Sequence, residues 1–343
     1  MSAESQPLVT VITPVYNGQE YMAECIQSVL DQTYARWEYL IVDNCSQDRS
    51  FEIARQFAGK DERIRIVSQK RHVSAGENHQ TGFREMSPHS KYCKVVHADD
   101  WLFPDCLTRM VEVAESHPAV GIVGAYRLDN LRVNLDGLPY PSTVVSGTEV
   151  CRRTLFGGFY VFGSPTSLLF RSEIVRQREP FYDEEGFPFH WDTAACFEVL
   201  RNLDFGFVHQ TLTFTRRPAG SRTSFGQKLS TCQVETLDML MKYGPFLLKP
   251  AEFNSCFHQR LKNYFRFLGR SMLHHHDRSF WNYHKRALRR LGTTPHPARM
   301  LWLLVSAVGN ELLYPARAMK RGFAHFRGDR SHRNAPVMNS TQR

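Results

Sequence analysis

Hydrophobic positions in the first 126 residues of the chain alternate between two spacings. Short apolar runs rich in β-branched residues have the length and composition of buried strands, and they lie at 8–12, 39–42, 64–67, 93–96 and 120–126. Between these runs apolar residues recur every three or four positions. This spacing predicts an amphipathic helix over about 20–32, a second helix capped by Asp48 and a third opened by Pro104. The alternation predicts an α/β fold with a central, mostly parallel sheet.

The strand pattern ends near residue 228, and amphipathic stretches follow it. They predict a basic helical extension over residues 227–343, with a disordered end, after a first domain over residues 1–226. The segment 300–308 is apolar, but it is shorter than the roughly 20 residues that a membrane-spanning helix needs. Because basic residues follow this segment, it suits a helix that lies in a membrane interface, although it can equally pack on the first domain.

Charge is divided unevenly along the chain. Residues 258–343 contain 17 Lys and Arg against 3 Asp and Glu, a net charge of +14, so the remainder carries −5 of the total of +9. Such a tail favours an anionic membrane surface over nucleic acid, because its aromatic residues stand among apolar neighbours rather than between basic ones. The eight cysteines form no CxxC pair, and the first six residues lack signal-peptide features. We therefore expect a cytoplasmic protein, peripherally associated with the inner face of the cell membrane.

Three polar motifs follow the predicted strands. They are TPVYN at 13–17, DNCSQD at 43–48 and HADD at 97–100. Because ligands of α/β sheets bind outside the carboxyl ends of parallel strands, we expect the motifs to share one site. Carboxylates there can accept hydrogen bonds from a base or a ribose, and one can hold a divalent cation against a diphosphate. The chain has neither GxGxxG after its first strand nor GxxxxGK[ST], which argues against dinucleotide and P-loop sites.

Four ordered segments resemble the nucleotide-sugar domain of family 2 glycosyltransferases, across roughly residues 7–125. They are VTVITPVYNGQEYMAECIQSVLDQTY, EYLIVDNCSQDRS, HVSAGENHQTG and VVHADDWLFPDCL. The resemblance implies the GT-A fold, an inverting reaction, a nucleotide-sugar donor and Mg²⁺ or Mn²⁺ held by Asp100. It implies nucleotide contacts from Thr13, Pro14, Tyr16, Asp43, Ser46, Asn78 and Asp99. Glu77 and His97 depart from the family pattern, which often has Arg and Asp at these positions.

The acceptor side is expected in the second half of the first domain. The segment 159–175 resembles the family's strand on that side, and Phe189, His190 and Trp191 occupy the region where the family has a catalytic Glu-Asp pair. Asp192 is the first carboxylate after that region. An inverting transfer needs a base for the acceptor hydroxyl, and either Asp192 or His190 has the chemistry. Asp192 also suits a helix N-cap.

A basic loop follows the last predicted strand. Arg216, Arg217 and Arg222 can bind the diphosphate through their planar guanidinium groups, or they can form a solvated basic surface. Both alternatives agree with the sequence.

The sequence therefore predicts a metal-dependent, inverting glycosyltransferase. Its donor would be a UDP-, GDP- or dTDP-sugar, and its acceptor a glycan or a lipid-linked saccharide such as a surface polysaccharide precursor. One alternative is a nucleotidyltransferase, although such enzymes usually have a Gly-rich, basic first loop. Another is a non-catalytic nucleotide-sugar-binding partner protein, which the missing Glu-Asp pair would suit.

Overall fold

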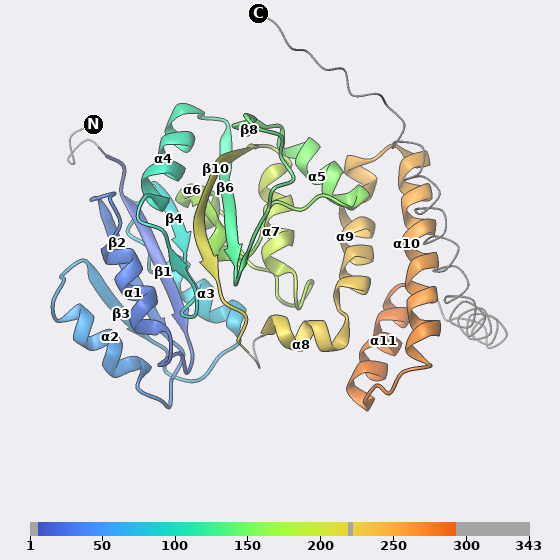
Figure 1. Cartoon of the computed structure of the whole chain (residues 1–343), viewed down its shortest axis with the longest axis horizontal. Coiled ribbons are helices and arrows are strands. Elements are labelled where there is room, and N and C mark those ends of the chain that lie inside the picture. Colours follow the sequence, from blue (N-terminus) through green and yellow to red (C-terminus); the bar gives the residue numbers. More distant parts are fainter. Residues whose placement is uncertain (1–5, 219–221, 293–343) are drawn as a thin grey trace, which may run out of the picture. The chain divides into compact units, whose positions relative to one another are not determined.

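A computed structural model describes residues 6–218 and 222–292 of the chain (Figure 1). In these residues a 10-stranded sheet has the strand order β3-β2-β1-β4-β9-β6-β10-β5, with β7 and β8 paired to β6 and β10. Helices lie against the sheet along its length (Figure 1). The expected α/β fold with a mostly parallel sheet is confirmed.

The amino-terminal strands form the parallel half of the sheet. They are β1 (Val9–Val15), β2 (Trp37–Asp43), β3 (Ile64–Ser68) and β4 (Tyr92–Val95). Val15 pairs with Asp43, and Asp43 pairs with Ser68, so the carboxyl ends of β1, β2 and β3 lie level. Because helices cover this half, β1, β2 and β4 are almost entirely buried, which explains their continuous apolar runs.

The other half of the sheet mixes strand directions. The long strands β6 (Val120–Asp129) and β10 (Asp204–Thr215) are parallel, whereas β9 (Leu168–Arg171) runs antiparallel to both β4 and β6. In the segment 159–175 the strand is confined to β9, because Gly163 has a φ of 71° and Pro165 opens a 3-10 helix. The shorter elements here are β5 (Trp101–Leu102), β7 (Arg132–Asn134), β8 (Val144–Val145) and η2 (Pro165–Ser167).

The amphipathic spacing in the sequence correctly located the amino-terminal helices. The helix α1 (Met22–Leu30) buries the predicted stripe, including Met22, Ile26 and Val29. The Asp48 carboxylate accepts a hydrogen bond from the Ser50 backbone at 2.9 Å, although the N-cap position of the next helix is Arg49. The helices after α1 are α2 (Ser50–Ala58), α3 (Ala75–Arg84), α4 (Cys106–Ser116), α5 (Gly147–Phe156), α6 (Ser172–Arg176) and α7 (Trp191–Leu200).

The chain divides into two compact units, residues 1–256 and residues 257–343. The first unit contains the sheet together with α8 (Arg222–Leu229) and α9 (Cys232–Leu247). The helix α10 (Pro250–Ser271) begins in this unit and ends in the second, which also contains α11 (Arg278–Arg290). The chain between residues 222 and 292 contains helices and no strand, as the loss of the strand pattern predicted.

The second unit has its own packed interior. The Tyr264 hydroxyl of α10 lies 2.8 Å from Nδ1 of His284 in α11, and both side chains are buried. Of the helices that the structure describes, none combines the length and the apolar composition needed to cross a membrane. The apolar segment 300–308 and the disordered end expected from the sequence lie outside the described residues.

A buried lysine joins the two halves of the sheet. Lys94 lies in the middle of β4 with no exposed surface, and its ammonium group donates to the carbonyl oxygens of Thr166 at 2.5 Å and Leu168 at 3.1 Å. Burial lowers the pKa of Lys94. The side chain therefore supplies the donors that η2 and the start of β9 need inside the protein.

We expect Lys94→Met to lower the free energy of unfolding by about 2–4 kcal/mol, because two buried carbonyl groups lose a donor. Lys91→Met is the matched control: the Lys91 side chain is 49% exposed and pairs with Glu115. Losing an exposed ion pair of this kind costs less than about 1 kcal/mol. Urea unfolding followed by circular dichroism measures both variants, and equal losses of stability would contradict the role of Lys94.

Candidate functional site

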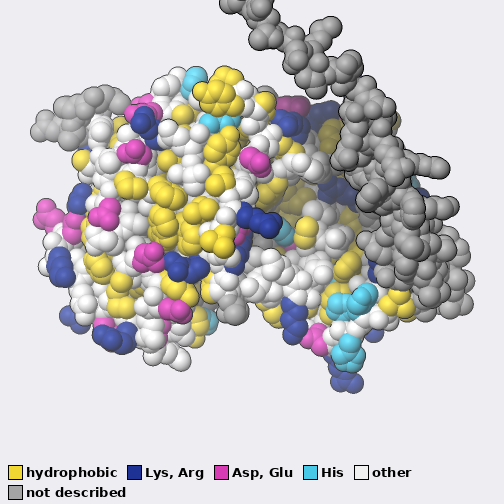
Figure 2. Space-filling view, in the orientation of Figure 1, with side chains coloured by type: hydrophobic (Ala, Val, Ile, Leu, Met, Phe, Trp, Pro, Cys, Tyr) yellow, Lys and Arg dark blue, Asp and Glu magenta, His cyan; other side chains and the backbone are white. Residues whose placement is uncertain are grey.

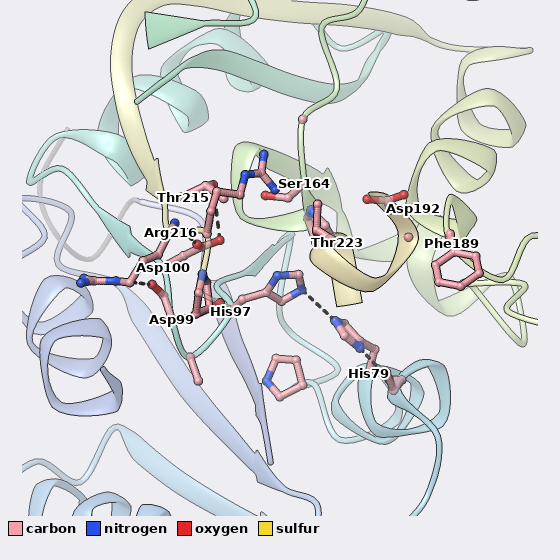
Figure 3. A pocket seen from close by; sticks show the side chains of 18 of the residues that line it. His79, His97, Asp99, Asp100, Ser164, Phe189, Asp192, Thr215, Arg216 and Thr223 are labelled. Atoms are coloured by element: carbon pink, nitrogen blue, oxygen red, sulfur yellow. Dashed lines mark hydrogen bonds between the residues drawn. The ribbon is translucent and has the colours of Figure 1, made fainter. Parts of the chain in front are cut away.

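An open cavity of about 830 Å³ lies in the first unit, at the carboxyl ends of β1 and β4. Residues after β1, β4 and β10 form one part of its wall, and the loop before η2 and the start of α7 form the other. The predicted residues that line it are Pro14, Tyr16, Asp99, Asp100, His190, Asp192, Arg216 and Arg217. Two of the three polar strand-end motifs, at 13–17 and 97–100, thus meet the predicted acceptor segment in one place (Figure 3), whereas no residue of the motif at 43–48 lines the cavity.

Asp100 is the most buried of these residues, with 2% of its surface exposed. Its carboxylate accepts hydrogen bonds from the Thr166 hydroxyl at 2.6 Å and from the Arg216 backbone nitrogen at 3.0 Å. Burial raises the pKa of the Asp100 carboxyl to about 6, while the nearby His97 opposes that rise. The group is therefore a desolvated carboxylate that a cation would stabilise.

Asp100 belongs to a group of three side chains that could hold a metal ion. The ligand atoms of His97, Asp99 and Asp100 all lie within 4.8 Å of one another. No other such group of three occurs in the part of the chain that the structure describes. The three consecutive histidines 274–276 lie between α10 and α11 in the second unit, where Figure 2 shows histidine side chains on the surface, and they do not form such a group.

A second histidine orients His97. The Nε2 atoms of His79 and His97 are 3.2 Å apart, and Nδ1 of His79 lies 2.7 Å from the Ala75 carbonyl oxygen (Figure 3). The carbonyl can only accept, so Nδ1 of His79 donates and its Nε2 accepts when the ring is neutral. The Nε2 of His97 then donates, and Nδ1 of His97 keeps the lone pair that a metal needs. Sequence reasoning missed His79 because nothing in its spacing links it to His97.

Two predicted nucleotide residues are placed at the cavity by β1. Pro14 and Tyr16 both line it, and the Tyr16 ring is 46% exposed and 4.4 Å from the His72 ring. Thr13 lies one residue before Pro14 in the strand, and its hydroxyl is buried 2.8 Å from the Tyr39 hydroxyl. Thr13 is not among the residues that line the cavity, so its hydroxyl bonds to the interior instead.

The other predicted nucleotide residues lie behind the wall. Asp43 is 5% exposed, and its carboxylate accepts from the backbone nitrogen of Ser46 at 3.3 Å. The Ser46 hydroxyl accepts from the Asn17 backbone at 3.1 Å, which joins this turn to the end of β1. Asn78 is 3% exposed and donates to the Val42 carbonyl oxygen at 3.1 Å. Each of these side chains fixes the backbone next to the cavity.

The two candidate bases stand at the start of α7. His190 occupies the N-cap position and Asp192 lies in the first turn, so the N-cap expected at Asp192 falls two residues earlier. The Asp192 carboxylate accepts from the Thr193 backbone nitrogen at 2.7 Å. Burial raises the pKa of Asp192 and lowers that of His190. His190 also lies 3.8 Å from the buried Glu235 carboxylate.

The arginines after β10 have protein partners. The Arg216 side chain donates to the Asp99 carbonyl oxygen at 3.1 Å, pairs with Glu24 at 2.6 Å and lies 4.1 Å from the centre of the Tyr21 ring. Arg217 pairs with Asp129 on β6. Arg222 begins α8, and its side chain lies outside the described residues.

A model of glycosyl transferase family 2 matches residues 10–179. EpsE of Bacillus subtilis (strain 168), named as a glycosyltransferase, is 31% identical over 160 residues, which are 44% of this chain and 56% of EpsE. TuaG of the same strain, named for teichuronic acid biosynthesis, is 35% identical over 107 residues, which are 31% of this chain and 42% of TuaG. The chain thus spans about half the length of these relatives.

Solved structures share the fold. The crystal structure of S. aureus TarS 1-349 in complex with UDP has a TM-score of 0.59, 15% identity, and coverage of 90% of this chain and 91% of that one. The mannosyltransferase PcManGT from Pyrobaculum calidifontis, in complex with GDP-Man and Mn²⁺, has a TM-score of 0.52, 16% identity, and coverage of 90% and 88%. The expected GT-A architecture is confirmed. With its ordered motifs and the match over residues 10–179, the chain belongs to glycosyl transferase family 2.

Proposed function

We propose that the protein is an inverting, metal-dependent glycosyltransferase that moves a sugar from a nucleotide-sugar donor to a hydroxyl acceptor. The observation that carries this proposal is that a metal-capable group, His97, Asp99 and Asp100, and a half-buried base candidate, Asp192, line one cavity. The structural relatives TarS and PcManGT were solved with UDP-GlcNAc and with GDP-Man and Mn²⁺, which supports a nucleotide-sugar ligand in this fold.

The donor base and ribose are assigned to the β1 side of the cavity. Pro14 and Tyr16 flank the base, and Asp99 accepts from the ribose hydroxyls. Because their side chains are held by protein partners, we assign an indirect, positioning role to Thr13, Asp43, Ser46 and Asn78. The base is taken as uracil, guanine or thymine, since nothing at the described wall selects among them.

The metal would be held by Asp100, Asp99 and Nδ1 of His97. The short separation of their ligand atoms and the buried carboxylate of Asp100 fit a divalent ion. A nitrogen ligand beside carboxylates suits Mn²⁺ better than Mg²⁺, which prefers oxygen ligands alone. A bound ion would neutralise the charge of the leaving diphosphate.

Asp192 is assigned as the general base. Its carboxylate faces the cavity from the first turn of α7, and burial makes it a stronger base than an exposed aspartate. It would take the acceptor hydroxyl's proton while the oxygen attacks the anomeric carbon from the side opposite the diphosphate, which inverts the configuration. His190, whose lowered pKa keeps the ring neutral at pH 7, is the competing base.

The acceptor is proposed to be a glycan or a lipid-linked saccharide, such as a surface polysaccharide precursor. The name of the relative TuaG supports this class, because it refers to teichuronic acid biosynthesis. Location in the cytoplasm, at the inner face of the cell membrane, is proposed from the +14 charge of residues 258–343. The end of α11, with Arg289 and Arg290 in its last turn, is part of that basic region.

A non-catalytic nucleotide-sugar-binding protein is the second candidate function. The observation that favours it is the sequence Phe189, His190 and Trp191 where a Glu-Asp pair was expected. Slow release of free sugar from UDP-sugars by the purified protein, abolished by loss of Asp100, would support the enzyme over this candidate.

Asp100→Asn should weaken Mn²⁺-dependent UDP binding by about a hundredfold or more, because it removes an anionic ligand from the site. Asp105→Asn is the matched control, since Asp105 is an exposed carboxylate in the same segment. Isothermal titration calorimetry with and without Mn²⁺ measures the affinity, and circular dichroism checks the fold. An unchanged Mn²⁺-dependent affinity in folded Asp100→Asn protein would show that the metal assignment is wrong.

Asp192→Asn should lower kcat by about 10²–10⁴-fold and leave UDP affinity nearly unchanged, because an amide cannot take the proton. A base must be ionised, and the pKa of Asp192 is raised, so the wild-type rate should fall with decreasing pH at values above the pKa of about 3.9 of an exposed aspartate. His190→Ala is the paired variant. If turnover collapses in His190→Ala and persists in Asp192→Asn, the base is the histidine.

Removing residues 298–343 should release the protein from vesicles that contain anionic lipid and leave UDP affinity unchanged. Basic residues near such a surface contribute about 1 kcal/mol each. Flotation of full-length and truncated protein with anionic and with neutral vesicles makes the comparison. Equal flotation of the two proteins with anionic vesicles would contradict the membrane role of this segment.

A further inference from the structure

Two arginines share one carboxylate at the wall of the cavity. The Arg127 guanidinium lies 3.1 Å from the Asp129 carboxylate and donates to the Asn134 side chain at 3.1 Å. Arg217 forms two hydrogen bonds with the same carboxylate, at 3.0 Å and 2.5 Å. The cluster formed by Arg127, Arg217 and Asp129 therefore carries one positive charge that no carboxylate in it balances.

The positive charge is held in a desolvated place. Arg127 is 6% exposed, yet it lines the cavity. Burial is the main cause that lowers the pKa of Arg127, and the neighbouring Arg217 cation is the next. The Nε of Arg127 donates to Asn134, and one terminal nitrogen donates to Asp129. The other terminal nitrogen of Arg127 makes no hydrogen bond to the described residues. An anion in the cavity would relieve this unbalanced charge.

A hydroxyl in the wall of the same cavity also lacks a hydrogen-bond partner among the described residues. The Ser164 oxygen is shielded from solvent and has no hydrogen bond within residues 6–218 and 222–292, although Ser164 lines the cavity. In the view of Figure 3, Ser164 lies between Asp100 and Asp192. A hydroxyl can donate to an anion as an arginine does. The unpartnered hydroxyl is an independent sign that a polar ligand group belongs here.

The position of the cluster distinguishes it from the diphosphate contacts. Arg216 extends toward Glu24 and Tyr21, on the β1 side. Arg127 lines the cavity together with Tyr160, whose hydroxyl lies 2.9 Å from that of Thr193, next to Asp192. Arg127 therefore lies on the side from which the sugar and the acceptor would reach the base.

We propose that Arg127, Arg217 and Ser164 form an anion subsite, and that the transferred sugar or the acceptor of this enzyme carries a carboxylate or a phosphate that binds there. This inference rests on the proposed function, because it assigns the substrate class of the same cavity. A planar guanidinium with a free edge suits the oxygens of either anion. A bound divalent ion would balance Asp99 and Asp100, so the charge of the cluster would remain for the substrate.

The test uses calorimetric titrations of the full chain. UDP with Mn²⁺ is titrated first, as a separate measure of the proposed function. UDP-glucuronate and UDP-glucose then test for an anion on the donor sugar. Glucuronate, glycerol 3-phosphate and neutral glucose, titrated into protein with UDP and Mn²⁺ and into protein without them, test for an anion on the acceptor.

Arg127→Gln is compared with Arg132→Gln, which removes the same charge from the exposed strand β7 outside the cavity. We expect UDP-glucuronate to bind at least about tenfold more tightly than UDP-glucose, or glucuronate or glycerol 3-phosphate to bind at least about tenfold more tightly than glucose. That preference should be lost in Arg127→Gln and retained in Arg132→Gln. If Arg127→Gln fails to fold, Arg127→Lys and Arg217→Gln take its place, since the Arg217 side chain is 28% exposed.

Loss of the preference in the UDP-glucuronate arm places the anion on the transferred sugar, and loss in the glucuronate or glycerol 3-phosphate arm places it on the acceptor. Both results support the subsite. A preference that survives in Arg127→Gln, or no preference in any arm, overturns it. If UDP does not bind, the proposed function is contradicted but the anion subsite is not. Binding of glycerol 3-phosphate that depends on Arg127, measured without UDP, would still support the subsite.

Discussion

The burial of the Asp100 carboxylate is the constraint on which the site depends. A carboxylate removed from water is costly unless donors or cations surround it. Thr166 before β9 and the backbone of Arg216 after β10 supply those donors, at 2.6 Å and 3.0 Å. Three segments far apart in the sequence must therefore meet at the end of β4. A cation could balance the remaining charge, and it could also neutralise a leaving diphosphate.

The sheet makes this meeting possible by changing direction. Because β9 runs antiparallel between β4 and β6, the residues before it reach the same edge as the residues after β4. Lys94 fixes this junction from inside the protein, since it donates to Thr166, whose hydroxyl in turn donates to Asp100. The buried lysine thus helps to position Asp100 indirectly, through Thr166. Such a rigid, fully paired network suits a site that must hold its geometry without water.

Charged side chains of both signs line the cavity. Asp99 and Asp100 bring negative charge, and Arg127, Arg216 and Arg217 bring positive charge. A substrate with a diphosphate and a second anion would suit such a wall. The same cavity places Asp192 and His190 next to each other, with burial moving their pKa values toward one another. Asp192 can accept a proton when its carboxylate is ionised, and His190 can accept one when its ring is neutral.

The sequence alone determined the amino-terminal strands, the amino-terminal helices and the motifs at the strand ends, because hydrophobic spacing and turn residues act locally. It also placed Asp99 and Asp100 at the carboxyl edge of the sheet, because parallel strands end at the same edge. The family resemblance, rather than a strand end, pointed to Asp192. Tertiary structure alone decided that the side chains of Thr13 and Asn78 form hydrogen bonds inside the protein. It also decided that His79 orients His97. Arg127 and Arg217 share the Asp129 carboxylate for the same reason. Each of these depends on side-chain direction and on partners distant in the chain. Neither quantity is contained in a local pattern of residues.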